Sequence, residues 1–244
     1  GYCMGCQYCL SGDHNLCMTA QPTIVAHYGG FAEQVRARAA SVIPLPSGLD
    51  AKTAGPLFCG GITVFNPLVQ FDVKPTARVG VIGIGGLGHM ALAFLNAWGC
   101  EVTAFSSTPE KRTEVLELGA HHTLDSRDPA ALKQMTGYFD LILSTVNVPL
   151  DWSAYMGTLK KKGRLHFVGV TLDPVELQIK SMISAQHSVS GSPVGAPATI
   201  ARMLDFAVQH GIAPITEHFG FDAVNDALHR LRSGETRYRV VLSR

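Results

Sequence analysis

The sequence lacks the features that direct a protein to a membrane or a polyanion. No apolar run reaches the roughly 18 residues that a bilayer span needs, and the first residues do not follow the order of a secretory leader. The net charge is only +1 at pH 7, without a basic stripe interleaved with aromatic side chains. We therefore expect a cytoplasmic protein that binds neither membranes nor nucleic acid.

The composition is that of a soluble enzyme. The chain has 244 residues, of which 46% are hydrophobic and 16% charged, enough for a large core in one domain or two unequal ones. It begins with Gly1 rather than Met, followed at once by a cysteine cluster. We expect that it begins in mid-domain.

Cysteine is scarce and unevenly distributed. Four of the six cysteines lie in "CMGCQYCLSGDHNLC" with the spacing C-x2-C-x2-C-x7-C, namely Cys3, Cys6, Cys9 and Cys17. Four thiolates suit a tetrahedral structural zinc ion and leave no open position for a substrate. The alternatives are disulfides, disfavoured by an intracellular setting, and an iron–sulfur cluster, disfavoured by the seven-residue gap.

The next segment predicts β structure and then a helix. Residues 31–37 and 41–44 alternate or run apolar, which is typical of strands. Asp50 can cap a helix that continues through "AKTAGPLFCGGITVFNPL". Cys59 lies within it, and the local sequence alone favours a buried thiol that packs as a small hydrophobe.

The strongest fold signal is "ARVGVIGIGGLGHMALAFLNAWG", an apolar β run, a glycine-rich turn and an apolar helix. The turn has the G-x-G-x-x-G pattern of dinucleotide-binding proteins in its proper context. Gly83 permits the tight turn, Gly85 the approach of a pyrophosphate and Gly88 close helix–strand packing, with phosphates at the helix N-terminus. Gly86 and Leu87 complete the turn.

Strands and helices then alternate along the chain, through "EVTAFSS", "HHTLD", "FDLILSTV", "GRLHFVGV" and "HSVSGS". Six β segments in this rhythm predict an α/β fold with a doubly wound parallel sheet covered on both faces. In the last part of the chain, apolar residues at helical spacing are expected to face the core: Phe221, Val224, Ala227, Leu228 and Leu231.

The end of the second strand indicates which dinucleotide binds. An NAD site presents an acidic residue there, whereas this chain reads "FSSTPEKR". Hydroxyls of Ser106 and Ser107 and the charge of Lys111, with Arg112 as a second candidate, suit the 2′-phosphate of NADP(H). The same letters also fit a helix start in which Ser107 and Glu110 form a capping box.

Together with "GETRYRVVL" near the end, these motifs resemble the zinc-containing medium-chain alcohol dehydrogenases. The chain is most similar to their cinnamyl-alcohol-dehydrogenase branch, which includes bacterial NADPH-dependent aldehyde reductases. The resemblance implies a Rossmann sheet plus the remnant of a mostly β, GroES-like catalytic domain. It places the catalytic-domain part with the zinc lobe at residues 1–63, the dinucleotide-binding domain at 64–208 and a return to the catalytic domain at 209–244.

The resemblance also implies roles for individual residues. The four-cysteine lobe would hold a structural zinc ion, Cys59 would be a ligand of a catalytic zinc ion, contrary to its local reading, and Thr63 would approach the nicotinamide. Arg239 would lie near the cofactor phosphates, although an exposed surface arginine is an equally good reading. The implied NADP(H)-binding residues are Gly83, Gly85, Gly86, Leu87, Gly88, Ser106, Ser107, Lys111, Thr145, Val146, Val168, Gly169, Val170 and Arg239.

One departure from the family pattern is large. Family members carry an earlier segment with G-x-C-H-S/T and G-H-E motifs, which supplies the other ligands of the catalytic zinc ion, and this sequence contains neither motif. His27, His89 and His121–His122 lack the spacing of metal ligands and are better explained as satisfied polar residues. Only Cys59 of that site is present, so we expect a truncated chain that binds NADPH and is inactive alone.

For the parent protein, the resemblance implies an oxidoreductase that interconverts aldehydes and primary alcohols with NADP(H) and zinc. A metal-independent quinone or enoyl reductase and a non-catalytic nucleotide-binding fragment are the alternatives. The resemblance further implies a homodimer formed through the dinucleotide-binding domain, near residues 190–195. Pro193 and the glycines of that segment equally fit an ordinary loop.

Overall fold

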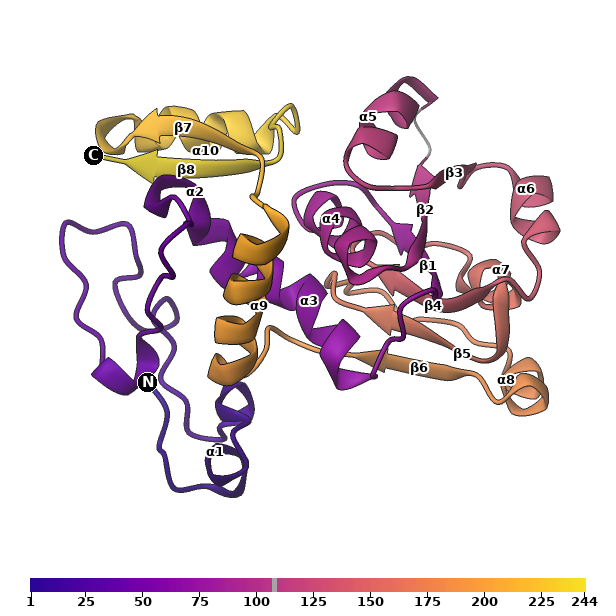
Figure 1. The fold of residues 1–244 in the computed structure, drawn as a ribbon, viewed down its shortest axis with the longest axis horizontal. Coiled ribbons are helices and arrows are strands. Elements are labelled where there is room, and N and C mark those ends of the chain that lie inside the picture. The colour runs from indigo at the N-terminus through magenta and orange to yellow at the C-terminus, as the bar shows by residue number, and fades with distance from the viewer. Residues whose placement is uncertain (107–108) are drawn as a thin grey trace.

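The computed structural model describes residues 1–106 and 109–244 and contains a six-stranded parallel sheet (Figure 1). The strands are β1 (Arg78–Ile82), β2 (Glu101–Ser106), β3 (His122–Asp125), β4 (Phe139–Ser144), β5 (Leu159–Phe167) and β6 (Ser188–Gly191). Their order in the sheet is β3-β2-β1-β4-β5-β6, and every neighbouring pair is parallel. The predicted α/β fold with a doubly wound sheet is confirmed.

Two apolar layers cover the two faces of this sheet. Alternate strand residues point to opposite faces, so Val79 and Val81 pack under α3 (Gly60–Gln70), α4 (Gly88–Trp98), α5 (Arg112–Glu117) and α9 (Pro197–His210). Ile82 and Ile142 contribute to the other layer, with α6 (Pro129–Gln134), α7 (Trp152–Gly157) and α8 (Ile179–Ala185). Each layer contains one of the two tryptophans, Trp98 against the first and Trp152 in the second.

The remaining elements form a smaller part beside α3 and α9 (Figure 1). It contains a short parallel pair, β7 (Thr216–Gly220) and β8 (Arg239–Ser243), and the helix α10 (Val224–Arg232). Helical elements precede α3: α1 (Gln7–Leu10), α2 (Ala51–Ala54) and the 3-10 turns η1 (His14–Leu16), η2 (Ala39–Ser41) and η3 (Gly55–Phe58). Of two further 3-10 turns, η5 (Phe221–Ala223) belongs to this part, whereas η4 (Pro109–Lys111) directly precedes α5 beside the six-stranded sheet. The domain boundaries at residues 63 and 208 stay a prediction.

The predicted strands at residues 31–37 and 41–44 are wrong. The first 50 residues, all of them described, contain no strand, and residues 39–41 form the turn η2. A strand needs a neighbour for its backbone hydrogen bonds, and no described segment pairs with this one. Its apolar side chains are exposed instead, with Phe31 at 66% and Val35 at 53%.

The single helix predicted from Asp50 is divided into three pieces. Asp50 caps α2 as expected, and its carboxylate accepts a hydrogen bond of 3.0 Å from Lys52 N–H. Pro56 lacks an N–H group and so cannot continue the hydrogen-bond ladder of α2. It stands instead in the first turn of η3, which follows α2. Cys59, with φ −122° and ψ −75°, separates η3 from α3.

The helix α10 only partly matches the predicted core face. Ala227 is 3% exposed, whereas Leu231 is 51% exposed, so the prediction that Leu231 faces the core is wrong. Among the described elements, α10 packs mainly against the two-stranded β7–β8 pair and η5. A sheet of two strands is too narrow to cover the last turn of the helix.

The start of α4 lies unusually close to the end of β1. A Cβ atom added to Gly88 would stand 2.0 Å from the carbonyl oxygen of Gly83. Such a distance is far below van der Waals contact, and the obstacle is backbone, which cannot rotate away. Gly88 therefore sets how closely helix and strand pack.

We expect Gly88→Ala to destabilise the fold by about 1–3 kcal/mol because the added methyl group forces the glycine turn apart. Gly157→Ala, at the end of α7, is the matched control, because no described atom lies within 4 Å of its added Cβ. Urea unfolding of both variants measures the difference. Equal stabilities would contradict this account of the turn.

Candidate cofactor and metal sites

The glycine turn between β1 and α4 is fixed from the neighbouring strand. Gly83 has φ +85°, a left-handed conformation that favours glycine. Thr145, directly after β4, donates its hydroxyl to the carbonyl oxygens of Gly83 at 2.7 Å and Ile82 at 3.0 Å. An added Cβ on Gly83 would stand 2.4 Å from Val146 Cγ1. Residues after two adjacent strands thus form one surface.

The middle of the turn is open. No described atom lies within 4 Å of a Cβ built on Gly85. The helix α4 begins after Leu87 without a side-chain cap hydrogen bond. Backbone N–H groups at an uncapped helix N-terminus attract anions, and the absence of a side chain at Gly85 allows close approach. This arrangement fits a pyrophosphate.

Arg239 on β8 extends to the same place. A Cβ added to Gly86 would stand 3.2 Å from Arg239 Nε, and one added to Gly60 would stand 2.2 Å from its Nη2. Arg239 Nε is buried and has no hydrogen-bond partner among the described residues. A buried N–H without an acceptor is costly, so a negatively charged ligand would satisfy it.

The ends of β4 and β5 lie against each other. Val168 and Gly169 both donate backbone N–H groups to the carbonyl oxygen of Ser144, at 2.9 and 3.0 Å. A Cβ on Gly169 would stand 2.3 Å from the carbonyl oxygen of Val146. Val170 follows with a 75% exposed side chain. Because parallel strands end at one edge, these residues share the edge of the glycine turn.

The segment expected to select the dinucleotide is described in part. Ser106 ends β2 and is half-buried, and Lys111 ends η4 and is also half-buried. Ser107 and Thr108 lie outside the described residues, so the predicted phosphate contact and the capping box of Ser107 both stay predictions. The last residue of β2, where NAD sites carry an acidic residue, is Ser106 in this chain.

Cys59 is exposed, so its local interpretation as a buried thiol is wrong. It directly precedes α3, and its carbonyl oxygen accepts the Thr63 hydroxyl at 2.7 Å. Cys59 and Arg239 both line a cavity of about 320 Å³. Outside the four-cysteine lobe, the buried thiol is that of Cys100, whose pKa is raised to about 11, chiefly by burial.

A second zinc site does not fit the residues around Cys59. Among residues 1–106 and 109–244, the four-cysteine lobe is the only group of at least three His, Cys, Asp or Glu side chains close enough to share a metal ion. One thiolate cannot hold zinc. The role of Cys59 as a zinc ligand therefore stays a prediction.

The four-cysteine lobe has the geometry of a metal site. The Sγ atoms of Cys3, Cys6, Cys9 and Cys17 all lie within 4.8 Å of one another, and no disulfide joins the described cysteines. Cys6 N–H donates to Cys3 Sγ at 3.2 Å, and Cys3 N–H donates to Cys17 Sγ at 3.4 Å. Backbone hydrogen bonds from Gly5 and Cys6 lower the pKa of Cys3 to about 6. This favours the zinc-binding thiolate at Cys3, whereas burial raises the pKa of Cys9 to about 12.

Sequence reasoning missed two contacts beside the glycine turn. His89 was expected to be a satisfied polar residue, which is confirmed, but its stacking on Tyr238 was not foreseen. Tyr238 also contacts Glu114 on α5. These residues are 25 to 149 positions apart in the chain, and only the "RYR" triplet near Arg239 hinted at them.

Comparisons with known proteins decide the family. The zinc-binding dehydrogenase family matches residues 86–209. An aldehyde reductase, AdhA of Synechocystis sp., is 61% identical over 243 residues, which cover 100% of this chain and 72% of that protein. The chain belongs to the zinc-binding dehydrogenase family. The predicted family resemblance is confirmed.

Solved structures of this zinc-binding dehydrogenase type agree. A cinnamyl alcohol dehydrogenase from Sorghum bicolor has a TM-score of 0.88 at 34% identity, covering 99% of this chain and 72% of that one. A cinnamyl alcohol dehydrogenase from Helicobacter pylori, complexed with NADP(H), has a TM-score of 0.86 at 29% identity, with 99% and 72% covered. No described helix is long and apolar enough to cross a membrane.

We expect the purified chain to contain about one zinc ion, held by the four-cysteine lobe. Cys17→Ser should lose that zinc and lower the unfolding temperature, because the lobe has few other contacts. Cys100→Ser, which alters a buried cysteine far from the lobe, should keep the metal. Elemental analysis after gel filtration measures both. Full zinc content in Cys17→Ser would contradict the assignment.

Proposed function

We propose that this chain is the cofactor-binding part of an oxidoreductase that interconverts aldehydes and primary alcohols with NADP(H). The observation that carries the proposal is the buried, unpartnered Arg239 Nε beside the open glycine turn at the carboxyl edge of the sheet. That edge is where doubly wound folds bind dinucleotides. The name of the 61% identical aldehyde reductase supports the substrate class.

NADP(H) rather than NAD(H) is the proposed dinucleotide. β2 ends at Ser106, where NAD sites place a carboxylate, and Lys111 at the end of η4 brings positive charge for a 2′-phosphate. The Helicobacter pylori relative, described as complexed with NADP(H), supports this choice. The nicotinamide supplies the hydride, and the chain's own residues bind and orient the carrier: the turn receives the pyrophosphate, and Thr145 holds the turn.

The four-cysteine lobe is proposed as a structural zinc site, remote in sequence from the cofactor edge. Cys59 and Thr63 are proposed to lie at the catalytic end of the cofactor, because the cavity lined by Cys59 also contains Arg239. We derive no metal-dependent step, since the described residues do not assemble a second zinc site.

A homodimer through β6 is also proposed. This strand is an edge of the sheet, and the neighbouring segment exposes large apolar side chains: Val170, Leu172, Ile179 and Ile183. An uncovered edge strand readily pairs with another strand. The homodimer predicted near residues 190–195 is consistent with that edge.

Lys111→Ala tests the choice of dinucleotide. We expect it to weaken NADPH binding by about tenfold or more, the value of a charge-assisted contact, and to leave NADH binding nearly unchanged. Lys133→Ala, an exposed lysine on α6, is the control. Fluorescence titration measures the dissociation constants. A wild-type chain that prefers NADH would reject the NADP(H) proposal.

A panel of aromatic and aliphatic aldehydes tests the chemistry. We expect the 244-residue chain to bind NADPH and to oxidise it no faster with aldehyde than without, because Cys59 has no metal-sharing neighbours among the described residues. Absorbance of NADPH follows the reaction. Rapid aldehyde-dependent turnover would show that the chain assembles a complete site. Turnover with quinones or enoyl compounds instead would favour the metal-independent alternative.

A further inference from the structure

His89, the residue after Gly88, connects the glycine turn to the last part of the chain. Ile215 N–H donates to His89 Nε2 at 3.3 Å, so Nδ1 carries the proton and donates to the Gly85 carbonyl oxygen at 3.0 Å. The ring is only 2% exposed. Burial, and then the charge of Arg239, lower the pKa of His89 to about 4, which keeps the ring neutral and this pattern intact.

Tyr238 stacks on one face of the His89 ring. The two rings are nearly parallel, 9° apart, with centroids separated by 4.7 Å, and Tyr238 is 6% exposed. The Tyr238 hydroxyl donates to Glu114 Oε1 at 2.6 Å. Arg237 Nη1 contacts both oxygens of the same carboxylate at 2.7 Å. Tyr238 is thereby held between α4 and α5.

The residue that follows is Arg239, whose guanidinium lies over Gly60 and Gly86. Its Nε has no partner among the described residues, so no hydrogen bond from this atom fixes the side chain. Its backbone N–H and that of Tyr238 both donate to the Ile215 carbonyl oxygen at 3.2 Å, and the N–H of Ile215 donates to His89. The backbone of Arg239 is therefore linked to His89 both through Ile215 and through the stacked Tyr238. The same histidine holds the carbonyl of Gly85 in the turn.

We infer that Tyr238 and His89 are positioning residues that hold Arg239 in register with the glycine turn, so that both meet one pyrophosphate. The inference rests on the proposed function for its ligand, a dinucleotide. Glu114 extends the connection to α5, the helix that follows Lys111. One link therefore joins three regions proposed to contact the cofactor: the turn, the guanidinium and the segment after β2.

Two substitutions separate the parts of this link. Tyr238→Phe keeps the stacked ring and loses the bond to Glu114, whereas Tyr238→Leu loses both. We expect NADPH binding by the full 244-residue chain to weaken about threefold in the first and about tenfold in the second. Arg239→Gln weakens binding by itself. In that background, Tyr238→Leu should add little, because its effect passes through Arg239.

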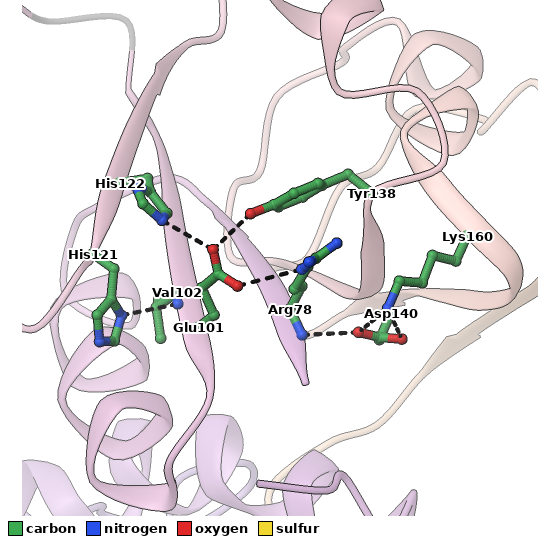
Figure 2. Close-up of polar contacts among 8 residues, drawn as sticks. All are labelled: Arg78, Glu101, Val102, His121, His122, Tyr138, Asp140 and Lys160. Atoms are coloured by element: carbon green, nitrogen blue, oxygen red, sulfur yellow. Dashed lines mark hydrogen bonds and ion pairs between the residues drawn. The ribbon is translucent and has the colours of Figure 1, made fainter. Parts of the chain in front are cut away.

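The chain offers a matched control at the opposite end of the sheet. Tyr138 also donates its hydroxyl to a carboxylate, Glu101 Oε1, at 2.6 Å, and this carboxylate also contacts an arginine, Arg78 (Figure 2). Tyr138→Phe thus removes the same kind of bond away from the proposed cofactor edge. We expect it to leave NADPH binding unchanged.

Hydrogen exchange of residues 83–89 gives a second readout without cofactor. We expect exchange in this segment to become at least about threefold faster in Tyr238→Leu and to stay unchanged in Tyr138→Phe. Wild-type NADPH affinity in Tyr238→Leu, an undiminished loss in the Arg239→Gln background, or unchanged exchange would each overturn the inference. If the wild-type chain binds no NADPH while exchange still quickens, the proposed function fails, and Tyr238 only supports the turn.

Discussion

The contact between the first residue of α4 and the carbonyl of Gly83 determines the rest of the cofactor edge. Because α4 starts without a side chain at Gly88, the helix N-terminus lies directly over the end of β1. Thr145 can then bond the same turn from the next strand, and Arg239 can lie over Gly86. A bulkier residue at position 88 would move the helix N-terminus away from Thr145 and Arg239. One close backbone approach thus organises residues from three distant segments, namely the glycine turn, the end of β4 and β8.

The sheet could be predicted because the sequence pattern of each strand and helix is contained within a few neighbouring residues. β1, β2 and β4 are short, mainly apolar runs between helical segments, and a parallel doubly wound order is nearly forced by right-handed crossovers. The glycine turn could also be predicted from the sequence. Gly83 needs a left-handed backbone conformation, and Gly88 needs a close approach to backbone, which only glycine allows. The structural arrangement of the four cysteines also follows from their spacing alone.

Predictions failed where the outcome depends on partners. Residues 31–37 have the alternation of a strand, yet no described segment pairs with them, and Phe31 is exposed. Leu231 has helical spacing toward a core, but the two-stranded β7–β8 pair does not extend far enough to bury it. Cys59 is apolar in its local context and exposed in the fold. The stacking of Tyr238 on His89 joins residues 149 positions apart, which no periodicity can reveal.

The two tryptophans divide between the two faces of the sheet, Trp98 beside the α3–α4–α9 layer and Trp152 within the α6–α7 layer. Trp98 also donates its indole N–H to the Val73 carbonyl at 2.7 Å, whereas Trp152 is 4% exposed among apolar and aromatic neighbours. Their emission therefore originates in different surroundings. The protein carries an intrinsic optical probe for each layer, and replacing either indole would leave a spectrum that reports on the other layer alone.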